Sequence, residues 1–174
     1  MNGRNFVAGI FAAAALFVAP LAAGTTRITE SLMLEYVNWI TDNSEFEYSG
    51  EALPEITFRT TVELQQMQYG EERWKELAAT GLDLPEIVAL FDRHENRILF
   101  NTGVDFSDWS NDHVIVHELV HYLQMTNQTP SNCSLDLEPA AYALQIEWQD
   151  QFDHPGERPD QFRLVMLNVG CSAL

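Results

Sequence analysis

The residues with the clearest chemical potential are two histidines and a glutamate in one short apolar segment. His117 and His121 are four positions apart in the stretch HVIVHELVHYLQ, and Glu118 directly follows the first histidine. On an α-helix, four residues correspond to about 40° of rotation and about 6 Å of rise. Both imidazoles would therefore leave one face of the helix and can meet at one ion. Two neutral imidazole nitrogens supply half of a tetrahedral zinc site.

The position of Glu118 predicts a different role. Its side chain would lie too far round the helix to be a third ligand, but it can reach a water molecule at the metal. The pattern H-E-x-x-H on a helix therefore predicts two zinc ligands and a general base. The alternative is a pair of core histidines satisfied by hydrogen bonds, with Glu118 exposed. That alternative explains each residue singly but not their combination.

A catalytic zinc site needs a third protein ligand and one open position. We predict Glu138, which follows His121 by 17 residues and would begin a second helix. Asp136 is the main alternative ligand. Small side chains after Glu138 would let this helix approach the first one closely; they are Ala140, Ala141 and Ala143. The remaining downstream candidates are Glu147, Asp150 and His154.

Other side chains near these positions have more than one open interpretation each. Tyr142 and Gln145 should share the helix face of Glu138. Tyr142 would either act in catalysis, by orienting a ligand or donating to an oxyanion, or simply pack between helices. His113 is a substrate contact, a misleading third ligand, or a histidine near solvent at the helix start. His154 is either an electrophilic partner or a surface loop residue.

The sequence HELVH followed by E-x-x-A-Y-x-x-Q resembles the gluzincin zinc metallopeptidases, especially small secreted bacterial members. The likeness covers residues 86 to about 150, and Pro139 departs from the family's pattern. It implies that His117, His121 and Glu138 hold Zn²⁺ and that Glu118 is the base that deprotonates the attacking water. It also implies a sheet whose edge strand binds extended peptide, for which we expect residues 97–101.

The expected function is therefore peptide hydrolysis, with a peptide or protein as substrate. Two alternatives remain open: a non-catalytic zinc-binding or scaffold protein, and a zinc amidase that acts on a non-peptide substrate. The chain has nine basic and 26 acidic residues and a formal net charge of −17. Such a charge repels phosphates, which disfavours nucleic acid and anionic membranes as partners.

The elements that must position these residues alternate between helical and β patterns. Apolar periodicity predicts helices at 28–42, 61–80 (interrupted at Gly70), 110–126, 136–152 and 159–169. A strand is expected at 54–60, and a hairpin is expected from strands at 86–92 and 97–101. Asp108 and Ser110 are suitable N-caps for the histidine helix. The predicted fold is α+β: a minimal zincin-like domain with an H-E-x-x-H helix, a glutamate-bearing helix and a small sheet.

The ends of the chain indicate export. Residues 1–23 combine Arg4, an uncharged alanine-rich run and a small-residue exit, which is typical of a secretory signal peptide. Residues 24–174 would then form one secreted or periplasmic domain without stable membrane insertion; an uncleaved anchor is the alternative. In an oxidising compartment Cys133 and Cys171 are expected to form a disulfide, and two free thiols are the alternative.

Overall fold

The structure is a computed structural model that describes residues 27–107 and 109–159. The predicted signal peptide, the predicted helix at 159–169 and Cys171 therefore lie wholly or almost wholly outside the described residues. The cleavage site and the Cys133–Cys171 pairing stay predictions. Among the described residues, no helix combines the length and the apolar character needed to cross a bilayer.

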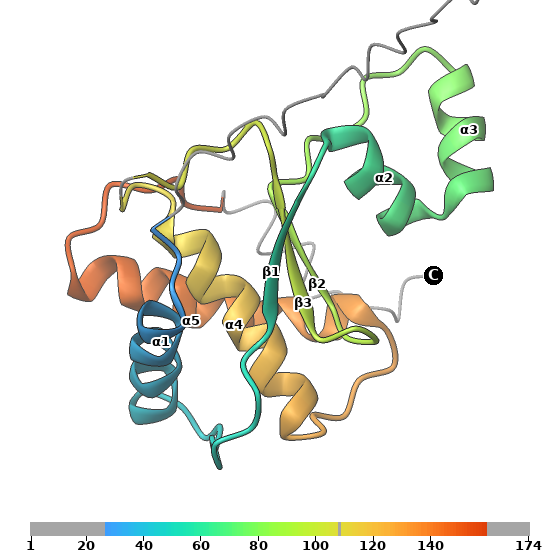
Figure 1. The fold of residues 1–174 in the computed structure, drawn as a ribbon. Coiled ribbons are helices and arrows are strands. Elements are labelled where there is room, and N and C mark those ends of the chain that lie inside the picture. Colours follow the sequence, from blue (N-terminus) through green and yellow to red (C-terminus); the bar gives the residue numbers. More distant parts are fainter. Residues whose placement is uncertain (1–26, 108, 160–174) are drawn as a thin grey trace, which may run out of the picture.

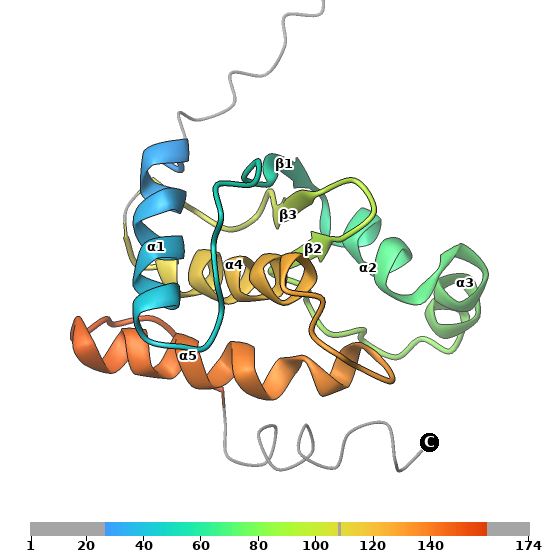
Figure 2. The same ribbon diagram turned by 90° about the horizontal axis from the view of Figure 1, so that it is seen from below.

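The described residues form a small sheet and helices around a central helix, α4, which confirms the α+β class (Figure 1). In the view from below, α4 lies between the sheet and α5, and α1 crosses one end (Figure 2). In chain order the elements are α1 (Glu30–Asp42), β1 (Glu55–Arg59), α2 (Thr61–Tyr69), α3 (Glu71–Ala79), β2 (Ala89–Asp92), β3 (Arg97–Asn101), α4 (Asp112–Thr126), the 3₁₀ turn η1 (Ser134–Asp136) and α5 (Glu138–Gln151).

The sheet has the strand order β1-β3-β2. The predicted hairpin is confirmed, because β2 pairs antiparallel with β3. The prediction that residues 97–101 form the edge strand is wrong. β1 pairs in parallel with the other side of β3, from Glu55 opposite Arg97 to Arg59 opposite Asn101, so β3 is central. The edge strand beside α4 is β2, which contacts that helix.

The predicted helix at 61–80 is two helices. Thr60 and Glu63 form a capping box at the start of α2, with the Thr60 hydroxyl accepting from the Glu63 backbone N–H at 3.3 Å. Gly70 ends this helix with a φ of +78°, a conformation that glycine adopts without steric cost. The chain therefore turns sharply, and α3 projects from the molecule with no buried residue (Figure 1).

The core is built around α4, and most residues of this helix are buried. Its fully buried apolar side chains are Ile115, Val116, Leu119, Val120 and Leu123. Burying one such side chain contributes about 1.5–3 kcal/mol. The helix begins after Asn111, whose side chain makes no capping bond, so the prediction of Ser110 as the N-cap is wrong; Asp108 lies outside the described residues. Packing rather than capping therefore fixes this helix.

The close approach of α5 to α4 depends on one alanine. Ala141 is 0 % exposed and belongs to the core cluster with Leu144 and Trp148. Ala140 and Ala143 are exposed. The prediction that all three alanines face α4 is therefore wrong for two of them, because only Ala141 lies on the buried face of α5.

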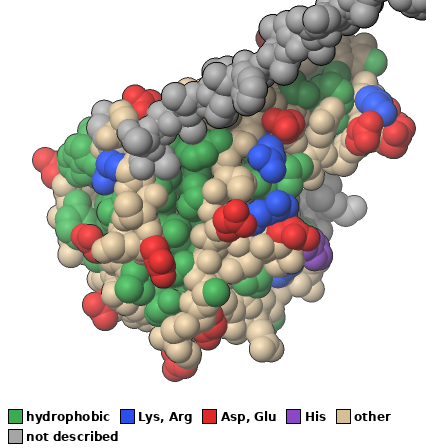
Figure 3. Space-filling model, in the orientation of Figure 1, with side chains coloured by type: hydrophobic (Ala, Val, Ile, Leu, Met, Phe, Trp, Pro, Cys, Tyr) green, Lys and Arg blue, Asp and Glu red, His purple; other side chains and the backbone are tan. Residues whose placement is uncertain are grey.

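On the face shown in Figure 3, acidic side chains are scattered rather than gathered in one patch. Asp and Glu side chains lie among apolar ones across the visible face, and basic side chains lie beside acidic ones. On α3 these contacts are ion pairs: Lys75 Nζ lies 2.8 Å from Glu71 Oε1, and Arg73 Nη1 lies 2.9 Å from Glu76 Oε2.

Candidate metal centre

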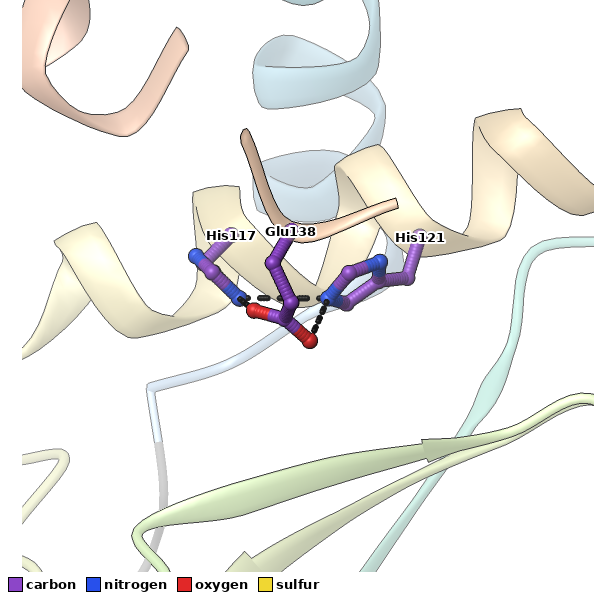
Figure 4. Close-up of side chains that lie close together, drawn as sticks. All are labelled: His117, His121 and Glu138. Atoms are coloured by element: carbon purple, nitrogen blue, oxygen red, sulfur yellow. Dashed lines mark hydrogen bonds and ion pairs between the residues drawn. The ribbon is translucent and has the colours of Figure 1, made fainter. Parts of the chain in front are cut away.

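The three predicted ligands converge on one point (Figure 4). The Nε2 atoms of His117 and His121 are 3.2 Å apart. The carboxylate of Glu138 spans both, with Oε2 at 3.3 Å from His117 Nε2 and Oε1 at 3.4 Å from His121 Nε2. Of the described residues, these three form the group of side chains whose donor atoms could hold a metal ion.

Two helices bring these side chains together. His117 and His121 project from the same side of α4, one turn apart, and Glu138 reaches them from the start of α5 (Figure 4). Pro139 occupies the first turn of α5, where proline is tolerated because the N–H it lacks would have no helical partner. Pro139, at which the sequence departs from the gluzincin pattern, therefore does not turn Glu138 away from the histidines.

The donor atoms are close enough to share one ion. The two Nε2 atoms are 3.2 Å apart, and each lies 3.3–3.4 Å from a different oxygen of the Glu138 carboxylate. In a tetrahedral site with bonds of about 2.0–2.2 Å, two ligand atoms lie about 3.3–3.6 Å apart, so the separation of the two imidazole nitrogens is close to that of zinc ligands. Two imidazoles and one carboxylate are also a donor set that suits zinc and that catalytic zinc sites use. The residues present therefore fit the ion that the sequence predicts.

The other candidate carboxylates do not join this group. Asp136 Oδ2 accepts a hydrogen bond from the backbone N–H of Asn132 at 2.8 Å. Asp150 pairs with Arg158 at 2.7 Å, and Glu147 is exposed. The carboxylates of these candidates do not belong to the metal-holding group.

Each ligand imidazole contacts a glutamine through its second nitrogen. His117 Nδ1 lies 3.1 Å from Gln145 Oε1, and His121 Nδ1 lies 2.8 Å from Gln124 Oε1. Such contacts fix the orientation of a metal-binding ring. The spacing of Gln145 to Glu138 predicts that both lie on one face of the helix. Gln124 was missed, although its position three residues after His121 on the same helix is a usable signal.

The electrostatics of the three side chains favour a shared positive charge. Burial alone would raise the pKa of Glu138, but hydrogen bonds from His117 and His121 outweigh it and hold that pKa far below its usual range. Burial lowers the pKa of His121, but the hydrogen bond and charge of Glu138, together with Glu118, raise it to about 9. The three side chains together thus stabilise a positive charge at this position, whether a proton or a metal ion carries it.

Glu118 lies outside the ligand group, as the sequence predicts. Its side chain is buried, which corrects the alternative in which it is exposed. Burial raises its pKa, while the charges of His117 and His121 and a hydrogen bond from the backbone of Phe91 lower it in part. The carboxylate therefore lies between α4 and the edge strand β2, beside the metal-holding group.

The site opens into a cleft of about 650 Å³. The lining residues come from the end of α2, from β2 and the segment that leads into it, from α4, from η1 and α5, and from the segment after α5. The lining residues are Gln68, Tyr69, 85–91, Arg93, His113, Val114, His117, Glu118, His121, Met125, Ser134, Leu135, Leu137, Glu138, Tyr142, Gln145 and 157–159.

The structure also places the side chains whose roles were left open. Tyr142 lines the cleft, and its ring centroid lies 4.4 Å from that of His117. His113 and His154 were each given a solvent-exposed alternative, which is wrong, because both are buried. His154 Nε2 lies 2.6 Å from the carbonyl oxygen of Trp109, and burial with the nearby His154 lowers the pKa of His113 to about 4.

Comparisons with known proteins give a family but no activity. No curated protein and no solved structure matches the chain. A family model described as a domain of unknown function, DUF6647, matches residues 25–173. Because this match covers nearly all of the chain, the chain belongs to the DUF6647 family.

Proposed function

We propose that the chain is an exported, zinc-dependent metallopeptidase with a zincin-like domain. The observation that carries this proposal is the convergence of His117, His121 and Glu138 at 3.2–3.4 Å beside a cleft that also contains Glu118. In this reading α4 is the active-site helix and α5 is the glutamate helix of a gluzincin. The signal-like sequence of residues 1–23 supports export.

The proposed chemistry assigns one role to each group. When bound, a zinc ion would polarise the scissile carbonyl and make the attacking water more acidic. Glu118 accepts the proton of that water as its oxygen bonds to the carbonyl carbon. Glu118 then gives the proton to the amine that leaves when the C–N bond breaks. Tyr142, which lines the cleft, is placed to orient His117 or to donate a hydrogen bond to the oxyanion.

The free edge of β2 supports an extended peptide as the substrate. Asn101 N–H donates to the Val88 carbonyl at 2.9 Å, so these two residues form a hydrogen-bonded antiparallel pair. Because such pairs alternate, Ala89 and Phe91 belong to non-hydrogen-bonded pairs, and their N–H and C=O groups point away from β3. Both residues line the cleft. The Phe91 N–H already donates to Glu118. The N–H and C=O of Ala89 and the C=O of Phe91 therefore support a peptide that adds to β2 as a short further strand.

The test of this function is the Glu118→Gln variant, with Glu147→Gln as a matched control on the exposed side of α5. The zinc-loaded proteins are incubated with a peptide mixture, and new termini are identified by mass spectrometry. We expect wild type and Glu147→Gln to cleave equally, and Glu118→Gln to keep zinc but lose at least about 10²-fold in rate.

Equal cleavage by wild type and Glu118→Gln would contradict the assigned base. Zinc-loaded wild type that cleaves no peptide would instead favour the non-catalytic alternative, in which the site serves stability.

A further inference from the structure

Two series of hydrogen bonds through glutamine side chains begin at the ligand imidazoles. The shorter series passes through one glutamine, Gln124, and connects α4 with α5. Gln124 Oε1 lies 2.8 Å from His121 Nδ1, and Gln124 Nε2 donates to the Leu137 carbonyl at 2.7 Å. Leu137 directly precedes Glu138, so one buried amide connects the ligand on α4 to the backbone beside the ligand on α5.

The longer series leads away from the metal-holding group. Gln145 Oε1 lies 3.1 Å from His117 Nδ1, and Gln145 Nε2 donates to Gln149 Oε1 at 3.4 Å. Gln149 Nε2 in turn donates to the carbonyl oxygens of Gly156 and Glu157, at 3.0 and 3.3 Å. Gln149 is 0 % exposed and Gln145 is 4 % exposed, so solvent does not substitute for these bonds.

The carbonyl groups at the far ends fix the direction of both series. A backbone carbonyl can only accept, so Gln149 and Gln124 must present their NH₂ groups to it. Their amide oxygens then face inward, and each oxygen must accept a hydrogen. At the inner ends the donors are the Nδ1–H groups of His117 and His121. With a metal ion bound, the lone pair of each ring would therefore be on Nε2, the atom that faces Glu138.

The segment 154–159, in which the longer series of hydrogen bonds ends, packs closely against α4 at Gly156. A Cβ added there would overlap the imidazole ring of His113. The Gly156 backbone N–H donates to His154 Nδ1 at 3.0 Å, and His154 Nε2 lies 2.6 Å from the Trp109 carbonyl oxygen. The rest of this segment, residues 157–159, forms part of the cleft wall. A displacement of the wall therefore moves the acceptors of Gln149.

We propose that Gln124, Gln145 and Gln149 are positioning residues that hold the proton of each ligand imidazole on Nδ1. Through Gln145 and Gln149, the His117 ligand is also coupled to the cleft wall at 154–159. This inference rests on the proposed metal site. It implies that Gln149, which contacts neither the ion nor an imidazole, affects the zinc affinity of the site.

The experiment measures zinc affinity by competition with a chromophoric chelator. Gln124→Met and Gln145→Met remove direct contacts to the imidazoles, and we expect each to weaken zinc binding by about 10–100-fold. Gln149→Met and Gly156→Ala act only through the series of hydrogen bonds. We expect each to weaken zinc binding about tenfold, at the lower end of that range. The absorption bands of the cobalt-substituted protein should shift in the same variants, because they report ligand geometry.

Gln65→Met is the matched control. Gln65 is also a buried glutamine that donates to a backbone carbonyl, that of Pro85 at 3.0 Å, and it accepts from Trp74 Nε1 at 3.2 Å. Its variant should lower the melting temperature and leave zinc affinity unchanged. Gln149→Glu adds a second check, since a carboxylate keeps the acceptor but cannot donate to the carbonyls; it should bind zinc as weakly as Gln149→Met.

The outcomes separate this inference from the proposed function. If wild type binds no zinc, the metal site itself is refuted. If wild type binds zinc and folded Gln149→Met and Gly156→Ala bind it equally well, the site stands and the coupling is refuted. Weakening in Gln65→Met as large as in Gln149→Met would also overturn the coupling, because a general loss of stability would then explain both.

Discussion

Replacing Ala141 by leucine should displace Glu138 without touching it. Ala141 is 0 % exposed on the face of α5 that packs against α4, and it lies one turn after Glu138. The leucine would add three carbon atoms where no space exists, and overpacking of this kind costs about 1–3 kcal/mol. For a domain of this size, each kcal/mol lowers the melting temperature by about 2–4 °C. The expected fall is therefore about 2–12 °C for the metal-free protein.

The same displacement should weaken zinc binding. Metal–ligand distances tolerate about ±0.2 Å, so moving α5 by the width of a methyl group takes the Glu138 carboxylate out of range. Melting is followed by circular dichroism and zinc binding by chelator competition. Ala143→Leu is the control, because Ala143 is exposed on the same helix and should change neither quantity. If the two variants behave alike, the packing of α5 on α4 does not position the ligand.

Three further predictions concern the whole domain. Zinc at 100 times its dissociation constant should raise the free energy of unfolding by about 2.7 kcal/mol, and a chelator should reverse the resulting rise in melting temperature; no shift would mean no binding to the folded state. Tyr122→Phe should leave the free energy of unfolding unchanged or raise it by up to about 1 kcal/mol, since the buried hydroxyl has no hydrogen-bond partner among the described residues; a clear loss of stability would reveal one. Asp92 has a pKa below its usual value because hydrogen bonds from Arg97, Glu95 and His94 outweigh burial, which alone would raise it. Asp92→Asn should therefore have a lower free energy of unfolding than wild type at pH 7. In chemical denaturation, this difference should shrink as the pH falls below about 4 and through the lowered pKa of Asp92. A difference that does not change with pH would exclude this charge as the cause.

The local parts of the site were predictable because they depend on short-range geometry. The spacing of His117 and His121 on a helix, and the placement of Glu118 beside them, follow from helical rotation alone. Glu138 was identified because a second helix had to bring a carboxylate back to the same point. The two strands of the hairpin were visible as β-rich runs on either side of a polar turn.

The features that were missed depend on contacts between distant segments. The position of β3 in the sheet depends on a parallel partner, β1, that lies more than 30 residues earlier in the sequence. The segment that connects the two strands contains α2, α3 and β2. The burial of His154 depends on the Trp109 carbonyl, 45 residues away. The orientation of Gln149 likewise depends on the carbonyl groups of Gly156 and Glu157, which lie in a loop whose course a helical pattern does not predict.

The most direct test of the central claim is the zinc content of the purified chain, measured by elemental analysis for wild type, His117→Ala and Glu138→Ala. We predict one zinc ion per wild-type chain and its loss in both variants. A wild-type chain without zinc, or a Glu138→Ala variant that keeps it at full occupancy, would contradict the assignment of these side chains as ligands of one shared ion.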